Sequence, residues 1–507
     1  MRLNRLNLDA VFCGKVPLHQ TNLIQPHGVL LIVAKDDLTI LQVSENITEV
    51  LSKPASEIAG TPLSDYINSE DVQLLQERFA NPIEGKIPLT FSFQQHGVLK
   101  KFLALVQMQP EYYIMELEKD TSSTEDSFIS VYQELKYVIA AIEATASIDA
   151  AAQLVATELK RISGFDKVMI YQFDKDWNGT VIAEAMEEGM DSYLGLQFPA
   201  SDIPRPAREM YRKNAYRFIP DVDYSPVRLY PVLNPVSGGF TDLTDSNLRS
   251  VAGVHLEYLR NMHVMASMST RIVKEDQLWG LISCHHRTAK YLSYQMCSLF
   301  ELLSNIISAR IVSLEQKEEF SFRSDKQDLY TKLIGQVYAG EKFPDVLYQQ
   351  GHELLKLLGA DGVALKLNGH IQTFGKTPER ADVDDLIFWL QSNQVHQLYH
   401  TSHLSAAYED AERYAATVSG LVALPVHPER GAYILAFRPE VVRQIDWGGN
   451  PDNAINFEPD GKRYHPRNSF SIWREQVQQQ SLPWAAEELE MADQFRTFIV
   501  DYTLRKL

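Results

Sequence analysis

The residues with the clearest chemical potential in this 507-residue chain are an aspartate, two histidines and a cysteine that lie far apart in the sequence. Asp202 lies in FPASDIPRPAREMY, residues 198–211, where each proline removes a backbone donor and fixes φ, so neither a helix nor a central strand can run through the prolines. We expect a rigid loop that presents one carboxylate, and its apolar neighbours favour packing over exposure to water. His255, His285 and Cys13 could supply hydrogen bonds, a switchable charge and a thiolate.

His255 lies on a predicted helix, residues 247–261, with the sequence NLRSVAGVHLEYLRN. The helical spacing keeps Arg249, Tyr258 and Met262 near this histidine. A single histidine on a helix is more often a hydrogen-bonded core residue than a ligand. The helix alone therefore does not identify a site.

His285 ends a predicted strand at residues 278–285, in which side chains alternate between two faces. One face is predicted to carry Trp279, Leu281, Ser283 and His285. Cys284 and His286 share the other face. A second histidine at the end of a buried strand favours a polar pocket, but an enzyme with a Cys–His or paired-His site is not favoured because no orienting carboxylate stands at a recognisable spacing.

Composition and charge exclude several classes of function. The net charge of −18 argues against a nucleic-acid surface, which needs concentrated Lys and Arg. No run of about eighteen uncharged apolar residues predicts a membrane span, and the N-terminus lacks the apolar core of a signal peptide. The three cysteines have no CxxC spacing, so we expect neither a zinc ribbon nor a disulfide scaffold. We expect a soluble, cytoplasmic chain of about three domains.

The first 127 residues predict a small domain and a linker. Residues 1–27, which include Cys13, are irregular. The predicted strands are 29–33 and 39–43, which we expect to form a hairpin, and 88–93, 101–108 and 112–117; the predicted short helices are 47–51 and 71–79. This order of strands, short helices and a three-stranded meander is similar to that of a PAS domain. The polar, acidic residues 118–127 predict the linker.

Helical periodicity begins at residue 128 and predicts a second, mixed domain. The predicted helices are 128–142, 150–162 and 247–261, and the predicted strands are 167–173, 180–187, 265–273 and 277–285. Between them lie the loop of Asp202 and a long segment, residues 221–246, for which we expect little regular structure. The order of these elements resembles a GAF domain.

Residues 281–334 contain neither glycine nor proline and carry an apolar stripe, which predicts a long helix that joins two domains or dimerises. A third domain at about residues 325–490 has GAF-like strands at 362–367 and 432–438, followed by a long insertion. A helix at 485–506 ends the chain. The sequence contains no P-loop, kinase or nucleotide-binding motif.

Together these stretches resemble one family over essentially the whole chain. FPASDIP resembles the bilin-contacting loop of bacteriophytochromes, a branch of the phytochrome family, and RSVAGVHLEYLRNM and QLWGLISCHH are similar to the two segments that flank the bilin there. WGGNP (447–451) and PRNSF (466–470) resemble the two strands of the phytochrome tongue. The resemblance implies an α+β fold in which each domain is a central antiparallel sheet with flanking helices, joined by long signalling helices. The implied domains are an N-terminal segment with a PAS domain at 1–120, a bilin-binding GAF domain at 128–313, and a PHY domain at 314–507 with its tongue at about 441–482.

The resemblance also implies roles for individual residues. Asp202 would offer its backbone carbonyl to the pyrrole nitrogens and its carboxylate to Arg467, and His285 would contact the D-ring carbonyl. Arginine forks suit the propionates for geometric reasons. The implied chromophore contacts are Cys13, Tyr171, Phe198, Asp202, Ile203, Pro204, Tyr211, Arg217, Arg249, His255, Tyr258, Ser267, Ser269 and His285. The implied signalling residues are Trp447, Arg467, Ser469 and Trp473.

The attachment site distinguishes branches of the family. Plant and many cyanobacterial phytochromes carry a cysteine immediately before the GAF histidine, where this chain has Val254. Cys13 falls where bacteriophytochromes bond the A-ring vinyl group, so the resemblance implies biliverdin IXα in a thioether to Cys13. At Ala252, relatives often have a hydroxyl residue, so the resemblance leaves one of the propionate contacts open.

The function implied by the resemblance is that of a red/far-red photoreceptor that works by Z/E isomerisation between rings C and D, without turnover beyond attachment of its own chromophore. Its implied partners are a second copy, bound through the helical spine, and a histidine kinase with its response regulator beyond residue 507; neither nucleic acid nor membrane is expected. Two alternatives remain at this point. A PAS/GAF sensor of haem or a cyclic nucleotide would not need Cys13 and the tongue motifs, and a Cys–His hydrolase should show thiolate-dependent turnover.

Overall fold

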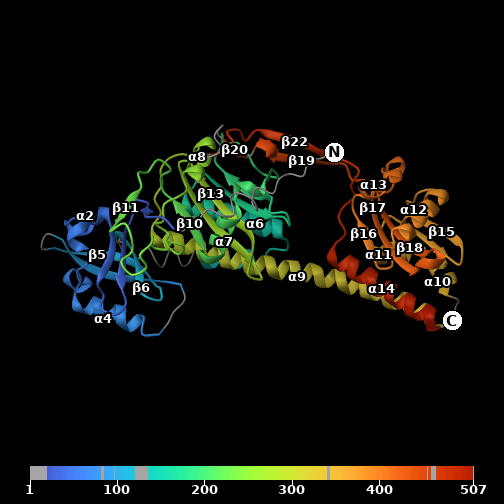
Figure 1. Ribbon diagram of the computed structural model, residues 1–507, viewed down its shortest axis with the longest axis horizontal. Helices are drawn as coiled ribbons and strands as arrows, with labels where there is room; N and C mark the ends of the chain where they lie inside the picture. Colours follow the sequence, from blue (N-terminus) through green and yellow to red (C-terminus); the bar gives the residue numbers. More distant parts are fainter. Residues whose placement is uncertain are drawn as a thin grey trace. The chain divides into compact units, whose positions relative to one another are not determined.

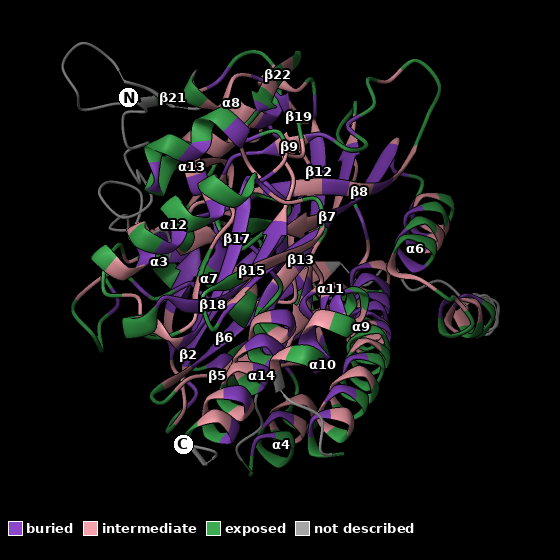
Figure 2. Ribbon diagram, turned by 90° about the vertical axis from the view of Figure 1, so that its right-hand side faces the viewer, coloured by how far each residue is buried: buried purple, intermediate pink, exposed green. Residues whose placement is uncertain are grey.

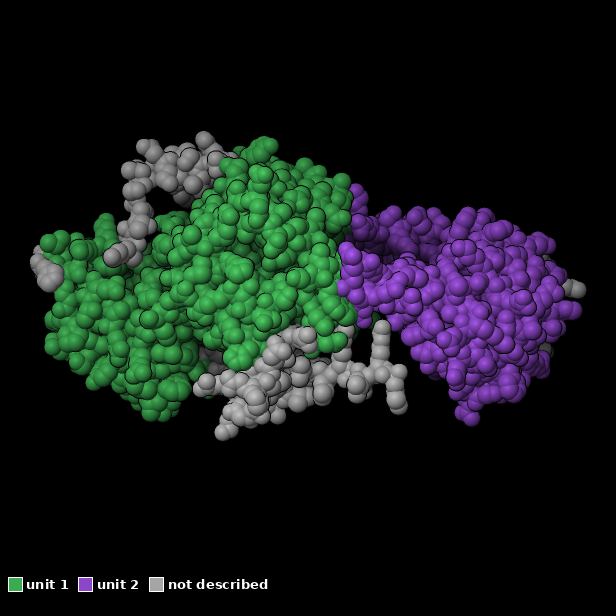
Figure 3. All heavy atoms as spheres, turned by 90° about the horizontal axis from the view of Figure 1, so that it is seen from above, with its two compact units in different colours: residues 1–314, 446–473 green, residues 315–445, 474–507 purple. Residues whose placement is uncertain are grey.

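The structure, a computed structural model, describes residues 20–81, 85–95, 98–119, 135–339, 343–453, 455–457 and 464–505. The chain divides into two units, residues 1–314 with 446–473 and residues 315–445 with 474–507 (Figure 3). Cys13, residues 120–134 and Lys506 lie outside the described residues. The start of the predicted helix at 128–142 is therefore not described, whereas residues 135–143 are helical.

The N-terminal sheet of unit 1 confirms the predicted hairpin and meander and adds strands that were not predicted (Figure 1). Its strands lie in the order β1 (Leu23–Ile24), β11 (Val227–Tyr230), β3 (Ile40–Ser44), β2 (Val29–Ala34), β6 (Tyr112–Lys119), β5 (Val98–Met108) and β4 (Lys86–Gln95). The short helices α2 (Thr48–Leu51), α3 (Ala55–Ile58) and α4 (Ser69–Arg78) pack on it. β11 belongs to the segment 221–246, which has little local strand pattern and becomes a strand by pairing with β1 and β3.

A second sheet in unit 1 carries most of the predicted site residues. Its strands lie in the order β10 (Tyr216–Ile219), β12 (Ala266–Lys274), β13 (Gln277–His286), β7 (Lys167–Phe173), β8 (Gly179–Met186), β9 (Gln197–Phe198), β19 (Arg443–Gly448) and β22 (Ile472–Val477). One face packs against α6 (Ile148–Ser163) and the start of α9 (Tyr294–Tyr338). α7 (Arg205–Lys213) and α8 (Gly253–Asn261) lie on the other face. The buried residues of α6 follow the helical period, so only one stripe of this helix is buried (Figure 2).

The predicted long helix is present as α9. Phe300, Leu303, Ile307 and Ile311 lie in the core against the second sheet, and its later turns pack Leu333 and Val337 in unit 2. By length and composition alone this helix could cross a membrane, because one 18-residue window has a mean hydropathy of 1.4. Half of that window is buried inside the protein, as in a core helix.

Unit 2 is built on a third antiparallel sheet, in the order β15 (His370–Gly375), β14 (Gly362–Leu367), β18 (Ala432–Arg438), β17 (Gly420–His427) and β16 (Tyr399–Thr401). One core lies between this sheet, α11 (Gly351–Leu358) and α14 (Ala486–Arg505), and another lies under α12 (Arg380–Ser392). Two short helices, α10 (Phe343–Gln349) and α13 (Leu404–Ala407), complete the unit. The predicted strands at 362–367 and 432–438 are confirmed as β14 and β18.

The described part of the insertion predicted at 441–482 contains four strands. β19 and β22 lie side by side in the second sheet, and β20 (Ile455–Phe457) pairs with β21 (Tyr464–Pro466). Where the insertion leaves and re-enters unit 2, the Val441 amide donates to the Gln480 carbonyl at 2.8 Å. We call residues 441–482 the tongue from here on.

Two local predictions were wrong. The helix predicted at 247–261 begins only at Gly253, because the backbone before it pairs with β1 and the residue that follows β1. The Gln25 amide donates to the Leu248 carbonyl, and the Ser250 amide donates to the Leu23 carbonyl. Arg249 is therefore extended rather than helical. Trp279 does not share a face with Leu281, because a bulge in β13 opposite β12 breaks the alternation. Trp279 therefore packs against the hydrophobic core between the second sheet and α6.

Candidate ligand-binding site

A cavity of about 260 Å³ lies between the second sheet and helices α7 and α8. Its lining residues come from seven strands, from α7 and α8, and from the loops beside them. The predicted residues that line it are Tyr171, Phe198, Asp202, Ile203, Pro204, Tyr211, Arg217, Arg249, His255, Tyr258, Ser267, Ser269 and His285. Cys13 lies outside the described residues, so its place is not tested.

The loop of Asp202 is held rigidly at one side of the cavity. A short 3₁₀ turn, Ala200–Asp202, follows Pro199, and α7 starts directly after Pro204. The buried Arg208 on α7 donates to the Ile203 carbonyl at 2.7 Å and lies 4.6 Å from the ring centre of Trp177. The sequence analysis did not identify Arg208, although its place one turn into α7 could have indicated that it reaches back to the loop.

One oxygen of the Asp202 carboxylate is bound by two protein donors. Its Oδ2 accepts a hydrogen bond from the Tyr258 hydroxyl at 2.9 Å and another from Nη2 of Arg467. The Asp202 and Arg467 side chains are only 6% and 3% exposed. Burial alone would lower the pKa of Arg467, but the adjacent carboxylate of Asp202 prevails and raises it, so the guanidinium stays charged.

Arg467 reaches Asp202 because the tongue packs closely on this part of the protein. Its guanidinium lies over the rings of Phe198 and Phe470, and its backbone carbonyl accepts from Nδ2 of Asn261 at 3.1 Å. At Gly448, a Cβ atom would come within 2.6 Å of the Phe198 ring. Of the other predicted signalling residues, Trp447 is buried, Trp473 is half-buried, and Ser469 is exposed with its hydroxyl toward Ser471.

The opposite side of the cavity is cationic. Nη2 of Arg217 donates to the Arg249 carbonyl at 2.6 Å, whereas its buried Nη1 has no acceptor among the described residues. Burial lowers the pKa of Arg217, and burial together with Arg217 lowers the pKa of Arg249 to about 9. Asp202 is the only carboxylate among the described residues that line the cavity, and Arg467 already neutralises it. This side could therefore hold an anion such as a ligand carboxylate.

His255 and His285 line the cavity as neutral side chains. Burial and then the nearby Arg217 lower the pKa of His255 to about 4. Burial, followed by Lys167 and His255, lowers the pKa of His285 to about 3. The His255 ring stacks on Tyr258 with an interplanar angle of 9°. Both histidines can therefore donate and accept hydrogen bonds at neutral pH without adding charge.

Aromatic rings form the remaining wall, and one glycine makes room for them. A Cβ atom at Gly179 would overlap the Tyr171 ring, so only glycine allows that ring to lie across β8. Tyr193, which the sequence analysis missed, also lines the cavity, with its ring 5.8 Å from that of Phe198. Its segment is fixed by Glu184, which accepts from the Tyr193 amide at 3.1 Å.

A buried ion pair supports this wall. Lys167 and Glu184 are 2% and 4% exposed, their charged atoms lie 3.4 Å apart, and the Lys167 ammonium lies 3.9 Å from the centre of the Tyr193 ring. Lys167 stands opposite His285 in the register of β7 and β13. The alternation of β7, which places Lys167 on the face of Tyr171, was the sequence signal that could have found this pair.

Neither metal chemistry nor thiol catalysis is indicated by the described residues. None of their His, Cys, Asp and Glu side chains form a group that could hold a metal ion. Cys284 lies in the core on the opposite side of the sheet from His285, and burial raises the pKa of its thiol well above the ordinary value. Cys284 therefore cannot act with His285 as a nucleophile and base pair.

Models of three domain families match the chain, described as "PAS fold" at residues 13–120, "GAF domain" at 147–311 and "Phytochrome region" at 326–507. Cyanobacterial phytochrome B of a Nostoc species is 38% identical over 501 residues, which are 98% of this chain and 67% of the relative. The bacteriophytochrome of Xanthomonas campestris is 31% identical, over 98% of this chain and 79% of the relative. The chain spans 66% of the length of Cyanobacterial phytochrome A.

Solved structures show the same architecture. A bacteriophytochrome from the photosynthetic bacterium R. palustris matches with a TM-score of 0.84 and 34% identity, over 97% of this chain and 99% of the other. The photosensory core module of a Stigmatella aurantiaca phytochrome matches with a TM-score of 0.83 and 34% identity, over 97% and 98% of the two chains.

The two histidines predict a pH-dependent stability of the protein without a ligand. Their pKa values in the folded state lie below the ordinary value near 6.5, so below that pH the unfolded chain binds more protons than the folded one. The free energy of unfolding should therefore fall as the pH drops from about 6.5 to about 4, by up to about 1.4 kcal/mol for each unit of pKa shift. Urea denaturation at several pH values measures this loss, and His255→Gln should reduce it. His400→Gln, at an exposed histidine, is the matched control, and an unreduced loss in His255→Gln would contradict the interpretation.

Proposed function

The chain belongs to the phytochrome family, whose PAS-GAF-PHY photosensory core it comprises, and it is a red/far-red photoreceptor; we propose that its chromophore is biliverdin IXα, held in the cavity between β13 and α8. The observation that carries this proposal is the polarity of the cavity. Arg217 and Arg249 make one side cationic without a carboxylate of their own among the lining residues, and the other side is aromatic and neutral. A bilin has carboxylates on its middle rings and an uncharged terminal ring, and the two sides match these parts.

The polar and aromatic residues of the lining divide the contacts with the bilin among them in this proposal. When bound, the bilin supplies light absorption and Z/E isomerisation at the bridge between rings C and D. Arg217 and Arg249, helped by Ser267 and Ser269, bind the propionates. His255 and His285 provide hydrogen bonds without charge, and Tyr171, Phe198 and Tyr258 bound the D-ring with apolar faces. Ala252 lines the cavity without a hydroxyl group, and Ser250 is a hydroxyl residue close by in the same lining.

The attachment point in this proposal is Cys13. Val254, which stands where plant phytochromes carry the attaching cysteine, lines the cavity but has no thiol. Gln20 pairs with Asp242. Cys13 precedes Gln20 by seven residues, and seven extended residues span at most about 25 Å. Cys284 and Cys297 are buried in the core, and burial raises the pKa of both thiols, so neither competes for the bilin.

The signalling step that we propose uses the pair of Asp202 and Arg467. The pair fixes the tongue in one photostate, and its release in the other allows the strands near Trp447 and Trp473 to rearrange. The output would be a histidine kinase that acts on a response regulator. We also expect a homodimer through α9, whose Leu302 and Phe320 are exposed, and a cytoplasmic location.

Addition of biliverdin tests the chromophore. The protein should acquire a red or far-red absorption band that changes reversibly under red light. Arg217→Gln should weaken the reversible binding of biliverdin that precedes attachment by about tenfold to a hundredfold, because a charged hydrogen bond contributes about 1.5–3 kcal/mol. Arg228→Gln, at an exposed arginine on β11, is the control and should bind like the wild type. Equal affinity of all three proteins would contradict the assignment of the cationic side to the propionates.

Attachment at Cys13 is tested under denaturing conditions. The wild-type protein should carry a zinc-fluorescent bilin band on a denaturing gel, and Cys13→Ser should lose it while it still binds bilin non-covalently. Cys284→Ser is the control and should keep the band. The assignment is wrong if Cys284→Ser loses the band and Cys13→Ser keeps it.

The pair of Asp202 and Arg467 is tested by Arg467→Ala. The variant should bind bilin normally but photoconvert incompletely or revert about tenfold faster, as expected if one photostate loses about 1.4 kcal/mol. A surface pair is worth only ~0–1 kcal/mol, so Arg474→Ala at an exposed tongue arginine should have little effect. Normal photoconversion of Arg467→Ala, with an unchanged light-minus-dark infrared spectrum of the amide groups, would show that this pair does not link the chromophore to the tongue.

A further inference from the structure

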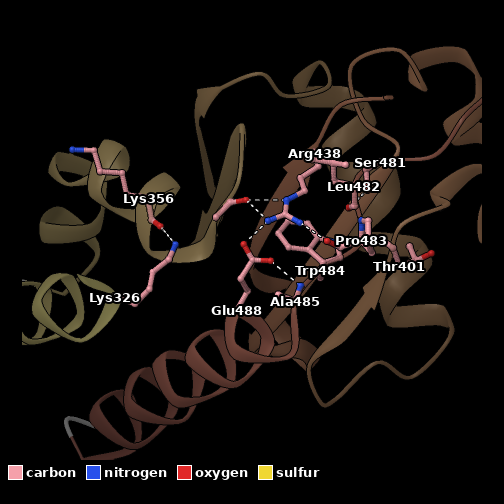
Figure 4. A network of polar contacts seen from close by, with 11 residues as sticks. Lys326, Lys356, Thr401, Arg438, Ser481, Leu482, Pro483, Trp484, Ala485 and Glu488 are labelled. Atoms are coloured by element: carbon pink, nitrogen blue, oxygen red, sulfur yellow. Dashed lines mark hydrogen bonds and ion pairs between the residues drawn. The ribbon is translucent and has the colours of Figure 1, made fainter. Parts of the chain in front are cut away.

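In unit 2, the side chain of Arg438 connects the residues just before and just after the tongue, and it also contacts the C-terminal helix α14. Arg438 is the last residue of β18, shortly before the tongue, and Pro483 and Trp484 follow directly after the tongue. Nη1 of Arg438 donates to the Pro483 carbonyl at 2.8 Å, and the guanidinium lies 3.9 Å from the centre of the Trp484 ring (Figure 4). Arg438 therefore fixes the two roots of the tongue to each other.

The same guanidinium holds the first turn of α14. Nη2 of Arg438 donates to Oε1 of Glu488 at 2.6 Å, and Oε2 of Glu488 accepts from the Ala485 amide at 2.8 Å (Figure 4). Glu488 thus binds the free amide at the start of α14, as the acidic residue of a capping box does, while it pairs with Arg438; the other half of the box is missing because Ala485 has no side-chain acceptor. The two side chains are only 12% and 11% exposed, so the pair is shielded from water.

Arg438 also binds a third segment. Nε and Nη2 donate to the Gly359 carbonyl at 2.9 and 2.7 Å, at the end of α11. Gly359 has a φ of +60°, and a Cβ atom there would lie 2.3 Å from Oε1 of Glu488, so glycine is required both for the turn and for the approach of the carboxylate. Lys326 on α9 donates to the Lys356 carbonyl of α11 beside this network (Figure 4).

Directed hydrogen bonds of one guanidinium therefore link the end of the tongue to the start of α14. All three nitrogens of the guanidinium are engaged with acceptors that belong to three different segments, and the flat group fits them with a fixed fork. If the carbonyl of Pro483 moves, Arg438 must either follow it and release Glu488 or stay and lose the contact with the tongue root. The buried site makes either loss costly.

We propose that Arg438 and Glu488 form the joint through which a rearrangement of the tongue reaches the first turn of α14. The proposal rests on the proposed function only in that light must rearrange the tongue. Arg438 and Glu488 are positioning residues, distant in the sequence from the chromophore cavity and absent from its lining. They act on the helix that ends the described chain.

The test is hydrogen–deuterium exchange of the bilin-loaded protein, in the dark and after red light, followed in peptides that contain residues 484–492. The wild type should show a light-minus-dark difference in these peptides. Arg438→Lys, which keeps the charge but not the fork, and Glu488→Gln, which keeps the size but not the charge, should lose this difference while their absorption spectra still photoconvert normally. Tongue peptides should keep their own light-minus-dark difference in both variants.

Arg496→Lys is the matched control, because Arg496 forms a half-exposed pair with Asp493 on the same helix. It should leave the exchange difference of residues 484–492 unchanged. A full wild-type difference in both Arg438→Lys and Glu488→Gln would overturn the proposal, as would a wild type whose tongue peptides respond to light while residues 484–492 do not. Failure of the wild type to photoconvert would instead contradict the proposed chromophore, so the two failures are distinguishable.

Discussion

The contact on which the arrangement of the candidate site depends is the buried pair of Asp202 and Arg467. Removal of either charge would leave the other buried without a partner, which strongly destabilises the folded protein. The pair therefore forces two conditions on the sequence. The loop must be rigid enough to present a carboxylate at one point, which the prolines and Arg208 provide. The tongue must approach closely enough to reach it, which Gly448 and Gly449 allow.

The same pair sets the electrostatics of the cavity. Asp202 is the only acidic side chain among the described lining residues, and Arg467 neutralises it from the tongue. The positive charge of Arg217 and Arg249 is then not compensated within the cavity lining, while Lys167 and Glu184 neutralise each other behind the opposite wall. An anionic group is attracted to one side only. A ligand with carboxylates at one part and an uncharged ring at another is thereby oriented by the protein before any specific contact forms.

Much of this structure could be predicted from local patterns. The hairpin, the meander, β7, β8, β12, β13 and α9 follow periods of two or 3.6 residues, and the structure has them close to the predicted positions. Every residue that the motifs predicted as a chromophore contact, and that the structure describes, lines the cavity. What could not be predicted is set by distant residues. β11 lies in a segment with little strand pattern and forms because β1 and β3 pair with it, and Arg249 is extended because its backbone pairs with Ile24 of β1.

These distant pairings place the N-terminal residues in direct support of the cationic side. The amide of Gln25 holds the Leu248 carbonyl, its side chain donates to the Phe218 carbonyl at 3.1 Å, and Arg217 and Arg249 are the neighbours of those two residues. Asn247 is held in turn by Glu116 of β6, which accepts from its amide at 2.8 Å. The positions of the two arginines therefore depend on pairing with residues 22–25 and β6 as much as on the sheet that carries Arg217. Residues 22–25 therefore support the cationic side of the cavity, although they lie far from Arg217 and Arg249 in the sequence.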